Sequence, residues 1–78
     1  MSDSELQPFV NEWVELQLET GTRFTGRLVT KDDYPFLKTH YAIMTPSTAA
    51  NQGPSFNQVL PAKVVSIKIL DAPPEMLD

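Results

Sequence analysis

The sequence predicts a single all-β domain, built as a strongly bent five-stranded antiparallel sheet (an open barrel) with a short N-terminal helix. Two observations predict it. From Trp13 onwards, apolar and polar side chains alternate with a period of two, which is the spacing of half-buried strands. Gly26 lies inside the second such run, where glycine weakens a strand unless the sheet bends sharply or another backbone comes close.

The elements are expected in the following order along the chain. Ser4-Glu5-Leu6-Gln7 has the spacing of a capping box, so a short helix is expected there, and Pro8 requires it to end by about Asn11. The first strand begins at Trp13, and the others are expected at residues 23–31, 37–44, 56–60 and 64–70. The longest loop is residues 45–55, and the chain forms one domain over residues 1–78, with an ordered core at about 8–70 and acidic ends.

The chain is short, and two common ways of stabilising a small fold are missing. Among its 78 residues there is no cysteine, and the lone His40 has no cluster of carboxylates around it in the sequence, so neither a metal nor another cofactor is expected. A lone histidine is more often hydrogen-bonded within the fold or exposed to solvent than part of a functional site, and His40 is expected to lie on the third strand. Oligomerisation is the remaining way to stabilise so small a core, and an assembly is therefore expected.

The location of the protein is inferred from two features. No apolar run approaches the roughly 18 to 20 residues that span a bilayer. The first residues are acidic, where a secretion signal is basic. The chain is therefore expected to be cytoplasmic, not secreted and not bound to a membrane.

Charge is distributed unevenly along the chain. The net charge is −4, yet residues 20–70 hold all six basic side chains and only two acidic ones, and the two flanks hold the other eight acids. Steering of a charged partner depends on where the charges lie, so the body of the domain can attract a polyanion although the whole chain is acidic. The alternative is that acidic ends only keep a small domain soluble.

One stretch resembles the first motif of the Sm-like family. It runs Val14-x-Leu16-x-Leu18, then Gly21-x-Arg23-Phe24-x-Gly26-x-Leu28, then Asp32-x-Tyr34 and Leu37, and the hydrophobic spacing of Val59, Val64 and Ile67 is similar to the second motif. The resemblance covers about residues 8–70, and in length the chain is similar to short Sm-like proteins of bacteria and phages. It implies an SH3-like bent sheet, a homo-oligomeric ring of about five to seven subunits, and binding of single-stranded RNA.

The resemblance also implies which residues contact RNA. Tyr34 occupies the family's base-stacking aromatic position and Asp32 its acidic position. The family's Asn position holds Phe36, and its Arg-Gly step falls on Leu60-Pro61, with Lys63 as the nearest base. Tyr34, Phe36 and Lys63 are thus expected to form a stacking site that tolerates any base, with Asp32 beside it. The alternative is that Tyr34 and Phe36 are aromatic residues of a turn and a core. The Tyr-Lys-His signature of Hfq is absent.

Open edges predict how copies would join. Five short strands leave an edge unpaired, and an apolar edge pairs with another copy. The last two strands carry the expected interface residues, Val59, Leu60, Val64 and Leu70. The alternative is that these are core residues of a monomer.

Two other functions compete with an RNA-binding ring. One is an oligomeric scaffold for protein interactions that binds no RNA. The other is a monomeric OB-like barrel, disfavoured because that fold has a helix between its third and fourth strands, where this chain has Pro46 and Gly53-Pro54. An enzyme is not expected, because no nucleophile-and-base spacing and no phosphate-binding glycine loop is present.

Overall fold

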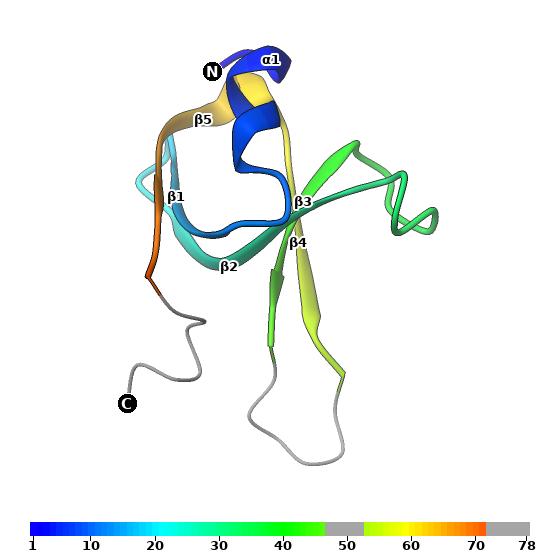
Figure 1. Cartoon of the computed structure of the whole chain (residues 1–78). Coiled ribbons are helices and arrows are strands. Elements are labelled where there is room, and N and C mark those ends of the chain that lie inside the picture. The colour runs from blue at the N-terminus through cyan, green and yellow to red at the C-terminus, as the bar shows by residue number, and fades with distance from the viewer. Residues whose placement is uncertain (47–52, 72–78) are drawn as a thin grey trace.

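The computed structural model describes residues 1–46 and 53–71 of the chain. It is a single antiparallel sheet of five strands with short helical turns before the first strand and before the last (Figure 1). The elements are α1 (Asp3–Leu6), η1 (Gln7–Phe9), β1 (Trp13–Leu18), β2 (Arg23–Thr30), β3 (Tyr41–Thr45), β4 (Ser55–Val59), η2 (Pro61–Lys63) and β5 (Val64–Ile69). No helix in this described part is long and apolar enough to cross a membrane.

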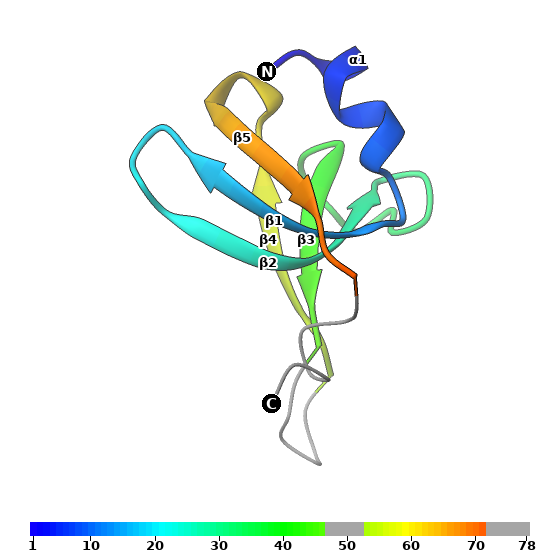
Figure 2. The ribbon, with the colours of Figure 1, turned by 60° about the vertical axis from the view of Figure 1, so that its left-hand side comes forward.

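The strand order in the sheet is β4-β3-β2-β1-β5. The last two strands in the sequence are therefore the two edges, and because they do not pair with each other the sheet is not closed into a barrel. In Figure 2 the ribbons of β1 and β5 run at a large angle to those of β3 and β4, with the long β2 curving between them. The all-β class, the five strands, the bend and the short helix were all expected from the sequence.

The bend is built around Gly26. This residue lies in the middle of β2, pairs with Val14 of β1, and comes just before the stretch of β2 that pairs with β3. A Cβ atom at this position would collide with the backbone carbonyl oxygen of Met44 and would lie 2.9 Å from Cγ2 of Ile43. Only glycine leaves room for β3 to come this close. Such a close approach of another backbone is one of the two reasons that the sequence predicts for a glycine inside a strand.

The core lies on the concave face of the sheet. Alternate residues of β1 and β2 point into it, and α1 and η1 close one end with Leu6, which is fully buried. Its buried members are Leu6, Val14, Leu16, Leu28, Tyr41, Ile43, Val59 and Val64. A second, smaller cluster of Val29, Leu37 and Ala42 lies on the opposite face.

The helix begins two residues earlier than expected. Ser2, not Ser4, is the N-cap, and its side chain and that of Glu5 form the reciprocal capping box. A helix capped at Ser4 would need the N–H of Pro8 for its first intrahelical hydrogen bond, and proline has none. The earlier start leaves Pro8 in the first turn of η1, where proline is tolerated.

The third strand begins at Tyr41 rather than at residue 37. Leu37 and Thr39 continue the alternation of Tyr41 and Ile43, but Leu37 belongs to the small cluster on the other face. His40 therefore lies before the strand and is exposed, not within it. Most of the acidic C-terminal end, residues 72–78, and most of the expected loop at 45–55 lie outside the described residues.

Candidate nucleic-acid interface

The connection between β2 and β3, residues 31–40, folds back over the convex face of the sheet. The amide N–H of Lys31 donates to the carbonyl of His40 at 2.8 Å and closes the neck of the loop. The amide N–H groups of Lys38 and Thr39 both donate to Oε1 of Gln58 in β4. Because Leu37 is also buried against the sheet, the loop is anchored at its base, its middle and its far side.

Tyr34 is held by this loop on top of two strands. Its hydroxyl oxygen accepts a hydrogen bond from Nη2 of Arg27 in β2 at 3.3 Å and lies 3.6 Å from the sulfur of Met44 in β3. Its ring centroid is 5.1 Å from that of Phe56 in β4. Tyr34 is half-buried as a result, and its orientation is set by all three of its neighbours.

Phe36 lies beside Tyr34 and is far more exposed. Its ring meets those of Tyr34 and Phe56 nearly edge to face, with centroid distances of 6.0 and 5.1 Å and interplanar angles of 78° and 86°. Two-thirds of the residue, 66%, remains accessible to solvent. The structure thus brings together the two aromatic residues expected from the sequence and adds a third. We call Tyr34, Phe36 and Phe56 the aromatic cluster.

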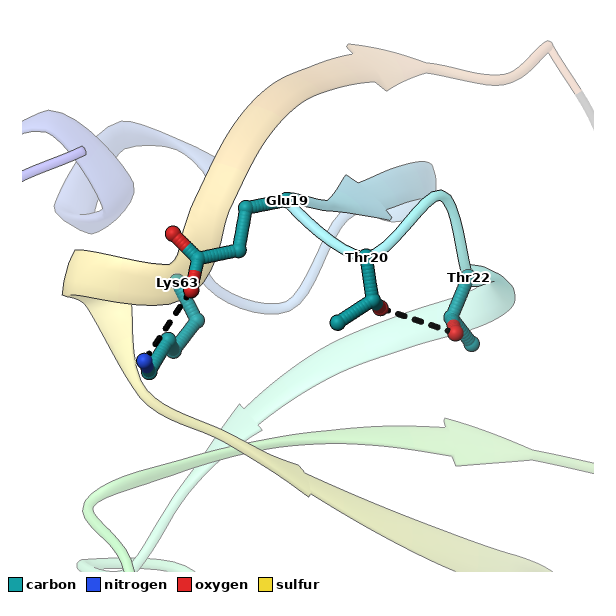
Figure 3. Close-up of polar contacts among 4 residues, drawn as sticks. All are labelled: Glu19, Thr20, Thr22 and Lys63. Carbon is teal, nitrogen blue, oxygen red and sulfur yellow. Dashed lines mark hydrogen bonds and ion pairs between the residues drawn. The ribbon is translucent and has the colours of Figure 1, made fainter.

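Lys63 is held elsewhere, by the turn between β1 and β2. Its Nζ atom donates a hydrogen bond to Oε1 of Glu19 at 3.0 Å. Figure 3 shows this contact and, in the same turn, the hydrogen bond between the hydroxyl groups of Thr20 and Thr22. The backbone strengthens this association, because the N–H of Glu19 donates to the carbonyl of Lys63 at 2.9 Å. Lys63 is therefore committed to Glu19 and does not join the aromatic cluster. Asp32 is exposed in the turn that precedes Tyr34.

Two members of this site were missed from the sequence. Arg27 and Phe56 were assigned only to the second and the fourth strand. The cross-strand register connects them, because Arg27 pairs with Met44 and Met44 with Phe56, which places all three on one face. The signal in the sequence was the alternation of side chains within β2 and within β4. To place Arg27 next to Phe56 from that signal, one also needs the register between strands that are far apart along the chain.

The expected interface residues divide into two kinds. Val59 and Val64 are each only 2% exposed, because their side chains pack in the concave core. They have no surface left to bury against a neighbour, so their assignment as interface side chains is corrected. Leu60 is 53% exposed, and Leu70 is half-buried, with its N–H bonded to the carbonyl of Trp13 at 2.7 Å.

Edge strand β5 carries two further exposed apolar residues. Val65 and Ile69 are 56% and 53% exposed. The pairing of β1 with β5 shifts register between Gln17 and Leu18, which leaves Val65 as the extra residue of a bulge. The regularly paired part of β5 therefore runs from Ser66 to Ile69.

A shallow groove of about 280 Å³ lies over β1, β2 and β5, away from the aromatic cluster. Its lining is polar and of mixed charge, with Nζ of Lys68 3.4 Å from Oε1 of Glu15. The lining residues are Glu15, Gln17, Arg23, Ser66, Ile67 and Lys68. It contains none of the residues expected to bind RNA.

Within residues 1–46 and 53–71, no three His, Cys, Asp or Glu side chains come together as a metal site would require. His40 lies against the ring of Tyr41, with centroids 4.7 Å apart.

Comparison of the chain with protein-family models, with curated proteins and with solved structures finds no match. The resemblance to the Sm-like family therefore stays a prediction based on the residues quoted above.

Proposed function

We propose that this chain is a Sm-like protein whose copies join edge to edge into a ring that binds single-stranded RNA with little base discrimination. The observation that carries the RNA part is the aromatic cluster, in which an anchored loop presents Phe36 to solvent beside Tyr34 and Phe56. Exposed aromatic rings are the usual platform for unpaired bases, and every base has a face that can stack on them.

Assembly is supported by the two free edges of the sheet. Each copy has β4 at one edge of its sheet and β5 at the other. When β4 of one copy pairs with β5 of the next, the first copy still has a free β5 and the second a free β4, so further copies can be added in the same way. Such a head-to-tail contact closes into a ring when the rotation permits. Leu60, Val65 and Ile69 would lose their exposed apolar surface there. The bulge at Val65 restricts the new pairing to Ser66–Ile69.

The charges of the chain predict how the RNA contact depends on salt. The six bases all lie in residues 20–70, but Lys63 and Lys68 are each close to a carboxylate. Within the described residues the other four bases make no ion pair, and the lysine of each of these two pairs is exposed to solvent. Affinity for RNA is expected to fall as the salt concentration rises. The slope of log K against log salt concentration should be modest, because each neutralised phosphate of a single strand contributes about −0.7 to that slope.

Binding of labelled oligo-U and oligo-A at low salt tests this function. Both are expected to bind, within about tenfold of each other, because neither Phe36 nor Leu60 offers a hydrogen bond to a base edge. Tyr34→Ala is expected to weaken both together, because it removes the ring against which Phe36 and Phe56 pack. If neither oligonucleotide binds, RNA binding is wrong and an oligomeric scaffold for protein interactions is the better account.

A further inference from the structure

Phe36 is an unusual side chain for a well-anchored loop. It is the most exposed large apolar residue of the described chain, at 66%, yet the next residue, Leu37, is only 3% exposed. The backbone that follows is fixed by two hydrogen bonds to Gln58. Its exposure is therefore not the result of a loose loop, and the chain forgoes the stabilisation that full burial of a phenylalanine side chain provides.

The ring is also held in a defined orientation. The rings of Tyr34 and Phe56 both meet it nearly edge to face, an arrangement that aromatic pairs favour. A ring fixed in this way loses little conformational freedom when a ligand packs on its open surface. Tyr34 presents less ring surface to solvent, because the residue is half-buried and its hydroxyl accepts a hydrogen bond from Arg27.

We propose that Phe36, rather than Tyr34, is the platform on which a base of single-stranded RNA stacks. The inference rests on the proposed function and names the residue that carries its main contact. A flat, exposed ring matches another flat ring without needing a pocket around it. Three bases lie in or beside the loop that carries Phe36, since Lys31 and Lys38 belong to that loop and Arg27 contacts Tyr34. They outnumber Asp32 and Asp33 of the same loop, which favours a polyanion as the partner. The site would then accept any base, because stacking does not read base edges.

Two substitutions at this position test the proposal. Phe36→Leu keeps an apolar side chain but removes the aromatic face, so binding of both oligo-U and oligo-A is expected to fall about 5- to 150-fold, the effect of losing one stacked base. Phe36→Trp keeps the face and adds a fluorophore, so it is expected to bind at least as well as wild type. Its tryptophan emission is expected to be quenched as RNA saturates. The wild-type protein, whose only tryptophan is Trp13, gives the baseline.

Thr22→Ala is the control, because it changes an exposed side chain in the turn between β1 and β2, outside the aromatic cluster. It is expected to bind both oligonucleotides as wild type does. The melting temperature of each variant shows that it is folded, and the exposure of Phe36 makes a folding defect at that position small.

The outcomes separate this inference from the proposed function. If wild type binds RNA and Phe36→Leu binds equally well, or Phe36→Trp shows no quenching beyond the baseline at saturation, RNA binding stands and Phe36 is not the platform. If wild type binds neither oligonucleotide at low salt, the proposed function fails and the inference fails with it.

Discussion

At the scale of single residues, Gly26 is the position where the fold depends on a missing side chain. Gly26→Ala places a methyl group against the carbonyl oxygen of Met44, in backbone that cannot move without breaking the pairing of β2 with β3. We expect a loss of about 1–3 kcal/mol in the free energy of unfolding, measured by urea denaturation.

Gly53→Ala is the matched control for this substitution. A Cβ atom at Gly53 has nothing within 4 Å, so the variant should be as stable as wild type or up to about 1 kcal/mol more stable. Equal stability of the two alanine variants would mean that β3 does not approach Gly26 as closely as described.

Tyr41 links the core to the N-terminal helix. The residue is fully buried, and its hydroxyl donates to the carbonyl of Asp3 at 3.3 Å and accepts from Nε2 of Gln7 at 2.7 Å. Tyr41→Phe removes both bonds, so we expect a loss of about 1 kcal/mol in unfolding free energy near neutral pH.

The same residue predicts a dependence of stability on alkaline pH. Burial raises the pKa of the Tyr41 phenol above its usual value near 10, and the hydrogen bond to Asp3 raises the pKa further. A pKa that is higher in the folded state stabilises the fold fully below the unfolded value and less as pH rises through the folded one. The advantage of wild type over Tyr41→Phe should therefore shrink above about pH 10. A difference in unfolding free energy between the two proteins that stays constant across that pH range would contradict a raised pKa of Tyr41.

At the scale of elements, the proposed assembly depends on the edge strand β5. Ile69→Asp places a charge on the regularly paired part of that edge, where it would be buried without a partner in the proposed interface. We expect light scattering to show a smaller particle, while circular dichroism shows a folded sheet. Thr22→Asp adds the same charge in an exposed turn between β1 and β2, and should leave the particle mass unchanged.

Substitution of Val64 distinguishes core from interface. Its side chain lies in the concave core, so Val64→Asp should unfold the protein rather than release folded monomers. A folded, monomeric Val64→Asp variant would place Val64 back in the interface.

Much of the element structure could be predicted from the sequence, because local alternation decides it. β1 and β2 each pack one face on the core, so Val14, Leu16 and Leu28 showed their period directly. The start of β3 could not be predicted, because Leu37 is buried by a loop that folds over the other face of the sheet, and it imitates the alternation of a strand. Ser2 and Ser4 both had a plausible capping residue three positions later, and Pro8 decides between them.

The candidate site was predictable only where its members are neighbours in the sequence. Tyr34 and Phe36 lie in one loop and do come together. Phe56 and Arg27 join them through strand register, and Lys63 leaves them because Glu19 binds it across the β1–β2 turn. Such tertiary partners have no local signal. The same holds for Val59 and Val64, whose apolar character fits a core and an interface equally well.

At the scale of the whole molecule, the proposed ring joins these features. A small core, two open edges and exposed apolar residues on or next to them all favour self-association. Repetition of the aromatic cluster in every copy would also raise the affinity for a strand long enough to reach several of them.

The solution mass of the wild-type protein tests this account most directly. Light scattering at micromolar concentration should give a single species of about five to seven times the 8.7 kDa chain mass, as a closed ring requires. A single species near 8.7 kDa would contradict the ring, and the edges of the sheet would then remain unpaired in solution.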